Sequence, residues 1–271
     1  MRADPWGLIN RAHCYPRLVL AGFRRYSAYR AAMLAGLSTN VVFGLMRVGL
    51  LLAVIGERPR VAGYDAAAAV TYVWLGQGMI ATVSMWSGFH VAERVRSGDI
   101  AIDLGRPWDF QLAELAGDLG RFGYHLVTRM VPPVAFGVLF FPFRWPQRLS
   151  TWGWFAVSLL LAVMVSFGIR YLLNLSAFWL VESRGLISIY GVASGLLAGL
   201  VIPLHFFPEG IRTILWWTPF PALMQDSLDV FVERGSPLPA VGHQLLWAVL
   251  LLLAGRLVQR SAERKLVVQG G

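Results

Sequence analysis

Residues 66–92 read AAAAVTYVWLGQGMIATVSMWSGFHVA and contain no Asp, Glu, Lys or Arg. This uncharged stretch exceeds the roughly 20 residues that a helix needs to cross the hydrocarbon core of a bilayer. Three further stretches are equally free of charge: 149–169, 185–208 and 235–255. With 56% hydrophobic and 14% charged residues, the chain has too little polar surface for a water-soluble protein of its length. We therefore predict an all-α integral membrane protein.

Two weaker stretches complete a prediction of six spans. Residues 31–56 are interrupted only by Arg47, whereas residues 123–143 include Arg129 and two consecutive prolines. The expected spans are about 31–56, 66–92, 123–143, 149–180, 185–207 and 235–255. No linker and no internal repeat divides the sequence, so residues 1–271 are expected to form a single transmembrane domain.

Basic residues are distributed unequally between the expected loops. The net charge of +9 comes almost entirely from arginine, since Lys265 is the single lysine. If the amino terminus is cytoplasmic, fifteen basic residues fall on the cytoplasmic side and six on the other. This asymmetry satisfies the positive-inside rule and argues against nucleic acid as a partner. We expect a multi-pass protein of the bacterial inner membrane with both termini in the cytoplasm and no cleaved signal peptide.

Glycine and arginine occur at informative positions inside the expected spans. Gly191, Gly195 and Gly199 are four residues apart, which predicts a close helix contact, either within the subunit or at a dimer interface. Arg47 and Arg170 fall at membrane depth, where an unpaired charge is costly. For both we expect snorkelling or a structural ion pair, with a role in a substrate path as the alternative.

Two segments next to the spans are amphipathic. Residues 16–30, PRLVLAGFRRYSAYR, place apolar and basic residues on different helical faces, which predicts an interfacial helix touching lipid headgroups, or else a simple basic lead-in. Residues 208–234 are too polar to span and too apolar for an ordinary loop. We predict an outer reentrant hairpin, with a plain outer loop as the alternative. Its expected anchors are Phe207, Pro208, Trp216, Trp217, Pro219 and Phe220.

The longest expected cytoplasmic segment, residues 93–122, mixes six acidic with four basic residues. Because the residue before a proline avoids helical geometry, Arg106-Pro107 predicts a turn. A short helix returning to the membrane is expected after this turn.

The motifs of several enzyme classes are missing. Lys265 follows RSAER, so the chain cannot carry the GxxxxGK[ST] loop that holds nucleotide phosphates. The five histidines are scattered without HExxH spacing, and no GxSxG elbow occurs. We therefore expect no catalytic residues, metal or cofactor in this chain, with any ATP and Mg²⁺ bound by a separate subunit.

The order of these parts resembles the permease subunits of ABC-2 type exporters. The run RSGDI at 96–100 followed by DLGRP at 103–107 is similar to a signature in that superfamily's branch of uncharacterised permeases. Ala28-Tyr29-Arg30 resembles the usual entry to the first span. Phe207-Pro208 and Thr218-Pro219-Phe220 resemble the outer hairpin of the family.

The resemblance implies partners. Residues 98–118 would contain a coupling helix that docks on a cytoplasmic ABC ATPase, present in two copies, with a solvated loop as the alternative. A second, different permease subunit is expected more than a homodimer. The residues implied in ATPase coupling are Gly98, Asp99, Ile100, Asp103, Leu104, Arg106, Pro107 and Trp108.

The resemblance also implies transport of an amphipathic or hydrophobic molecule, such as a drug, antibiotic or lipid, out of the cell. Spans one, two and five would line its path, and large adaptable side chains suit an apolar substrate. The candidate path residues are Trp74, Met79, Met85, Trp86 and Phe89. The alternatives are a lipid- or haem-handling assembly subunit, a passive scaffold, or an intramembrane enzyme, for which no polar catalytic set is visible.

Overall fold

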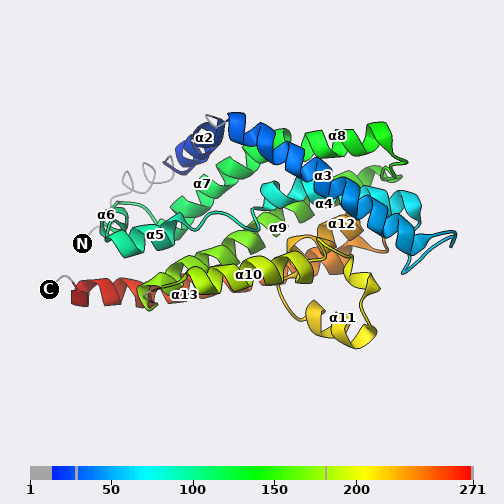
Figure 1. Cartoon of the computed structure of the whole chain (residues 1–271). Helices are drawn as coiled ribbons and strands as arrows, with labels where there is room; N and C mark the ends of the chain where they lie inside the picture. The colour runs from blue at the N-terminus through cyan, green and yellow to red at the C-terminus, as the bar shows by residue number, and fades with distance from the viewer. Residues whose placement is uncertain (1–13, 28–29, 181, 270–271) are drawn as a thin grey trace.

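A computed structural model describes residues 14–27, 30–180 and 182–269, and its regular structure is helical (Figure 1). The main helices are α2 (Cys14–Ser27), α3 (Arg30–Ile55), α4 (Ala66–Val83), α5 (His90–Ser97), α6 (Ile100–Leu104), α7 (Phe110–His125), α8 (Val131–Phe140), α9 (Leu149–Leu175), α10 (Arg184–Leu197), α11 (Glu209–Trp216), α12 (Gln225–Phe231) and α13 (Pro237–Gln269). One end of the bundle contains α2, α5, α6 and the C-terminal part of α13. We name it the α6 end.

Among the described residues, four helices are long and apolar enough to cross a membrane: α4, α9, and parts of α3 and α13. They coincide with the first, second, fourth and sixth expected spans. The expected third and fifth spans contain α8 and α10, which have 10 and 14 residues. At a rise of ~1.5 Å per residue, α10 alone is too short to cross a hydrocarbon core of ~30 Å, and α8 approaches that length only together with the π-helical turn and the end of α7 before it. The structure therefore supports a multi-pass membrane protein with four spans of full length.

The helix α4 lies at the centre of the bundle. Of its candidate span 78% is buried, whereas the corresponding windows of α3 and α13 are 22% buried. A protein interior composed of closely packed side chains therefore surrounds α4, while α3 and α13 keep apolar faces on the outside. Those faces are available to lipid or to another membrane subunit.

The expected second span is interrupted. Residues 66–92 were expected to form one helix, but α4 ends at Val83 and α5 begins at His90. Ser84 adopts a left-handed conformation with φ 61°, and Gly88 does the same with φ 92°. Because left-handed residues end an α-helix, the uncharged sequence continues through a sharp turn, residues 84–89, instead of a longer rod.

The expected interfacial helix is α2, which packs directly on α7. A Cβ atom built on Gly120 would lie 2.0 Å from the carbonyl oxygen of Val19, and one built on Gly22 would lie 2.3 Å from that of Gly117. The two backbones therefore approach closely because side chains are missing at the crossing. Ala28 and Tyr29, at the end of the expected interfacial segment, lie outside the described residues.

A continuous rod joins α7 to α8 through a π-helical turn, Leu126–Met130. Pro132 and Pro133 lie directly after the π-helical turn, inside this rod, where they cannot donate a hydrogen bond to the preceding turn, which is consistent with the irregular hydrogen bonding there. Because π-helical turns are uncommon and often occur at functional sites, this turn marks the expected third span as irregular.

At the other end of the bundle, which we name the α11 end, the expected hairpin contains two short helices. The helix α11 projects from the bundle, whereas every residue of α12 is buried (Figure 1). Buried backbone needs protein hydrogen bonds, and Gln225 of α12 supplies several. It contacts Tyr64, Tyr72, Leu204 and Asp229.

Candidate functional site

A buried charge cluster lies where α7 and α9 meet at the α6 end. The carboxylate of Asp118 accepts hydrogen bonds from Arg170 at 2.7 Å and from Arg121 at 2.8 Å. All three side chains are less than a tenth exposed. Two buried guanidinium groups therefore share one buried carboxylate, which satisfies its oxygens but leaves a local excess of positive charge.

The electrostatic balance of the cluster is set by two opposing effects. Burial alone raises the pKa of the Asp118 carboxyl. Arg170 and Arg121 outweigh burial and lower this pKa from 3.8 to about 2. The carboxylate therefore stays ionised at neutral pH and holds the two cations in place.

One polar stripe of α9 holds the turn between α4 and α5. Ser166, Arg170 and Asn174 are four residues apart and so share a helical face. Ser166 donates to the carbonyl oxygen of Ser84 at 3.2 Å, Arg170 to that of Ser87 at 3.3 Å, and Asn174 to that of Gly88 at 3.0 Å. Asn174 also accepts the backbone N–H of Ala92 at 2.8 Å. The turn is thus fixed along its length to α9.

The second arginine of the cluster closes the end of α4. Arg121 donates to the backbone oxygens of Ala81 at 2.6 Å and Thr82 at 3.3 Å. Carbonyl groups in a last helical turn lack intrahelical partners and carry the negative end of the helix dipole, so a cation stabilises them. Through Asp118, the end of α4, the 84–89 turn, α7 and α9 are joined in one network.

The predicted ATPase-coupling residues form the α5–α6 segment and the turn after it. Ile100 and Asp103 are buried, and Asp103 is paired with Arg94 and, at 3.6 Å, with Arg106. Those two predicted residues therefore stabilise the segment. The guanidinium of Arg106 lies 5.1 Å from the ring centroid of Trp108.

The exposed part of this segment includes Gly98, Asp99, Arg106 and Pro107, whereas Leu104 and Trp108 are half-buried. Ile102, which the sequence analysis did not select, is 66% exposed among these residues. Ile102 and its charged neighbours are thus the groups that this segment presents at the surface.

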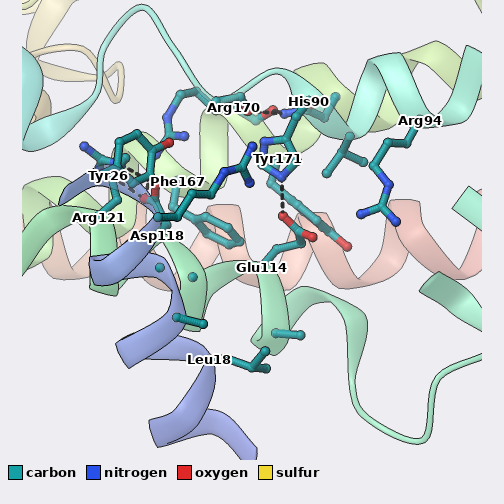
Figure 2. Close-up of a pocket in the computed structure, with 18 residues that line it drawn as sticks. Leu18, Tyr26, His90, Arg94, Glu114, Asp118, Arg121, Phe167, Arg170 and Tyr171 are labelled. Atoms are coloured by element: carbon teal, nitrogen blue, oxygen red, sulfur yellow. Dashed lines mark hydrogen bonds and ion pairs between the residues drawn. The ribbon is translucent and has the colours of Figure 1, made fainter. Parts of the chain in front are cut away.

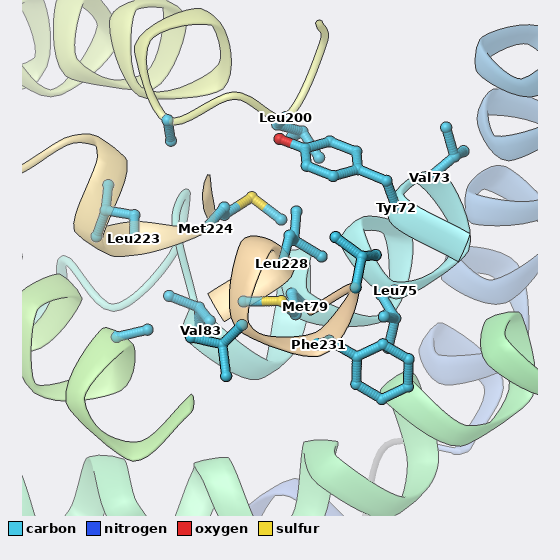
Figure 3. Packing of buried hydrophobic residues seen from close by; sticks show 14 of the residues in the cluster. Tyr72, Val73, Leu75, Met79, Val83, Leu200, Leu223, Met224, Leu228 and Phe231 are labelled. Atoms are coloured by element: carbon cyan, nitrogen blue, oxygen red, sulfur yellow. The ribbon is translucent and has the colours of Figure 1, made fainter. Parts of the chain in front are cut away.

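The five candidate substrate-path residues fall into two groups. Trp74, Met79 and Met85 are fully buried within the chain, and Met79 lies in the core near α12 (Figure 3). Trp86 and Phe89 instead line an open groove between the 84–89 turn and α10. Only the second group is accessible from the surface in this conformation.

Of the three predicted packing glycines, Gly191 and Gly195 lie within α10 and Gly199 lies just beyond its end. Cβ atoms built on Gly191 and Gly195 would lie 4.0 and 3.4 Å from the ring of Trp86 in the same chain. Gly199 follows the end of the helix, has φ 82°, and lies beside Tyr72 and Gln225. These glycines therefore make contacts within the subunit. The exposed side of α10 carries Leu186, Ile189, Val192 and Leu196.

The predicted hairpin anchors at the α11 end differ in how exposed their side chains are. Trp216 stacks on His243 with ring centroids 5.8 Å apart, whereas Trp217 is 80% exposed. Phe207, Pro219 and Phe220 are half-buried, and Pro208 is exposed.

The histidines at this end pair with carboxylates of α12, His205 with Asp229 and His243 with Asp226, each at 2.7 Å. No group of three possible metal ligands occurs in the described parts of the chain.

Of the two arginines at membrane depth, Arg170 belongs to a structural ion pair. Arg47 is half-buried and has one terminal nitrogen that is buried without a partner among the residues described. The sequence pointed to Arg170 but not to its partner, because Asp118 was placed with the polar loop. The four-residue spacing of Ser166, Arg170 and Asn174 was the signal available.

The sequence pattern of ABC-2 family transporter proteins matches residues 41–270. The chain belongs to the ABC-2 transporter family. No curated protein matches it in sequence. The family assignment confirms the resemblance and agrees with the helical, multi-pass architecture. ABC-2 proteins are membrane subunits that are generally not catalytic themselves and normally work with an ATPase subunit.

In this ABC-2 protein, the matched region includes the whole buried charge cluster and the α5–α6 segment, and the amphipathic helix α2 lies before it. The network is therefore part of the family's own domain. It joins the end of α4 and the 84–89 turn, which leads into the α5–α6 segment, to the middle of α7 and to α9.

Proposed function

We propose that this chain is the permease subunit of an ATP-driven exporter that moves an amphipathic or hydrophobic molecule out of a bacterial cell. The observation that carries the proposal is the bonding of the 84–89 turn to α9, in which Arg170 bonds the turn and is itself held by Asp118 of α7. The α5–α6 segment begins where this turn ends, so a force on the segment acts directly on α4, α7 and α9.

In this proposal the α6 end faces the cytoplasm of a bacterial cell, with the protein in the inner membrane. The proposal is supported by the positive-inside rule, because Arg24, Arg94, Arg96 and Arg106 all lie on helices or turns at this end. One of the two ATPase subunits would then dock on the α5–α6 segment. Exposed Ile102 and Arg106 offer the apolar and charged contacts.

ATPase closure would move the α5–α6 segment and, through the charge cluster, the end of α4. The groove of Trp86 and Phe89 lies on the same 84–89 turn, so its width would change with that movement. We propose this groove as the accessible part of the substrate path. Its aromatic walls and exposed Ser188 suit a molecule that is largely apolar with one polar group.

A second permease subunit, different from this one, would complete the membrane part. The proposal is supported by the exposed apolar faces of α3 and α10, which lie outside the subunit's own core. Contact between copies of this chain alone is the other arrangement, and purification of the complex distinguishes the two.

The test is affinity purification of the tagged protein from its native membrane, with identification of the chains that accompany it and measurement of ATP hydrolysis. We expect a Walker-motif ATPase that is lost in the double variant Gly98→Trp, Arg106→Glu. The matched control is Arg184→Glu, a charge reversal at an exposed arginine of the same end. Recovery of the intact protein without an ATPase contradicts the proposal and favours a scaffold or an assembly subunit.

A further inference from the structure

A cavity of about 260 Å³ lies at the α6 end between α2, α5, α7 and α9 (Figure 2). Since a water molecule occupies about 30 Å³ in the liquid, the cavity has room for a group much larger than one water. His90 and Arg94 lie on one side of it and Arg121 and Asp118 on the other. The amphipathic helix α2 contributes a wall that includes Arg25.

The lining of the cavity is positively charged. It contains four arginines, Arg25, Arg94, Arg121 and Arg170, against two carboxylates, Glu114 and Asp118. Glu114 is bonded to His90 at 2.8 Å, and Asp118 is shared between Arg121 and Arg170. Both carboxylates are thus engaged, and the surplus of guanidinium groups favours an anion in the cavity.

The arginines have two different roles at this site. Arg121 and Arg170 are buried and held by carbonyl oxygens and Asp118, so they supply a fixed positive potential. Arg25 is exposed and makes no hydrogen bond or ion pair with the part of the chain that is described. Arg94 is half-exposed and has donors beyond its bond to Asp103. Arg25 is therefore free to bind a ligand directly, and Arg94 can offer its remaining N–H groups while it stays paired with Asp103.

The wall formed by α2 indicates the kind of anion. Leu18 and Ala21 of this helix line the cavity beside Arg25, and elsewhere on its surface Leu20 and Phe23 are 48% and 40% exposed. The glycine crossing with α7 holds the helix in this position. An anion that carries acyl chains satisfies both surfaces, because its phosphate enters the cavity while its chains cover the apolar side chains.

We propose that this cavity binds the headgroup of an anionic phospholipid from the leaflet next to the α6 end. Arg25 and Arg94 contact the phosphate, and the buried pair Arg121 and Arg170 stabilises its charge from behind. The lipid holds α2 against α7 and α5, next to the network that joins the α5–α6 segment to the bundle. Its binding requires no ATPase and no transported molecule.

The experiment measures binding of dioctanoyl phosphatidylglycerol to the full-length protein in detergent by native mass spectrometry. We expect Arg25→Gln to weaken binding about fivefold, as for loss of one arginine near a phosphate, and Arg25→Glu to weaken it further. The matched control is Arg24→Gln, which removes the same charge from the neighbouring position of α2 outside the cavity lining. It should bind like the unmodified protein.

Three outcomes overturn the proposal. Equal weakening by Arg24→Gln and Arg25→Gln shows general surface attraction without a site. Binding of dioctanoyl phosphatidylcholine as tight as that of phosphatidylglycerol shows that the cavity does not select negative charge. Binding of inorganic phosphate as tight as that of the lipid, with the same dependence on Arg25, shows a site for a soluble anion.

Discussion

Arg170 of α9 donates a 2.7 Å hydrogen bond to Asp118 of α7, which lies 52 residues away in the chain. The same arginine bonds the carbonyl oxygen of Ser87 in the turn that ends α4. A cation at membrane depth is thus neutralised by a carboxylate from a polar helix and is used to fix a helix end. A buried ion pair is costly to assemble and more costly to break, so this contact makes three helices depend on one another.

The first prediction concerns loss of the carboxylate. Asp118→Asn leaves two buried arginines without an anion, and we expect it to lower the free energy of unfolding by about 3–5 kcal/mol. Thermal unfolding of the purified protein in detergent measures the change. Asp99→Asn is the control, because Asp99 is exposed at the same end and should have little effect. Equal stability of the two variants contradicts the structural role of the cluster.

The second prediction is that the stability conferred by Asp118 depends on pH. Because the pKa of Asp118 is lowered from 3.8 to about 2 in the folded protein, its ionised form stabilises the fold at pH values above about 4. This stabilisation is lost as the pH falls from about 4 toward 2. The stability difference between the unmodified protein and Asp118→Asn should therefore shrink over that range, as followed by unfolding at a series of pH values. A difference that grows on acidification contradicts this assignment.

The turn after α4 provides a test with a matched pair of glycines. A Cβ on Gly88 would lie 2.3 Å from a terminal nitrogen of Arg170, whereas one on Gly98 meets nothing within 4 Å. Both glycines have positive φ, 92° and 83°, so alanine is strained at either position. We expect Gly88→Ala to be less stable than Gly98→Ala by about 2 kcal/mol, because only the former displaces a bonded arginine. Equal melting temperatures would refute the contact.

The crossing of α2 and α7 is tested in the same way. Gly120→Ala would place a methyl group 2.0 Å from the carbonyl oxygen of Val19, which is backbone and cannot rotate away. Gly117→Ala, one turn earlier on α7, meets nothing within 4 Å. We expect overpacking in Gly120→Ala to lower the free energy of unfolding by about 1–3 kcal/mol and to increase hydrogen exchange in α2. Gly117→Ala should leave both nearly unchanged. Unchanged exchange in both variants would show that the helices are not held at this crossing.

Two buried glutamines make a further pair. The side chain of Gln225 forms hydrogen bonds with four other residues, whereas the side-chain amide of Gln77 has no hydrogen-bond partner among the residues described. Gln225→Leu leaves those partners unsatisfied and should cost about 3 kcal/mol. Gln77→Leu removes only an unbonded polar group and should be neutral or stabilising. Thermal unfolding separates them, and a larger loss for Gln77→Leu would contradict the assigned bonds.

The sequence by itself determined that this protein is a helical membrane protein of the ABC-2 type. Long uncharged stretches specify membrane helices because an exposed backbone is not tolerated in hydrocarbon. The same argument located α3, α4, α9 and α13, while the spacing of apolar and charged residues pointed to the amphipathic helix α2 and to the polar segment around α6 and α7. Arg106-Pro107 also marked the turn before α7, since proline restricts the residue that precedes it.

Only the tertiary structure decided how these parts are joined. Composition did not reveal that α4 stops at Val83, because left-handed turns depend on what holds them, here the side chains of α9. It did not show that Asp118 is the partner of Arg170, or that the glycines of α10 face Trp86 in the same chain. Hydrophobicity reports the solvent that a segment prefers, whereas ion pairs and close crossings depend on which distant segments meet.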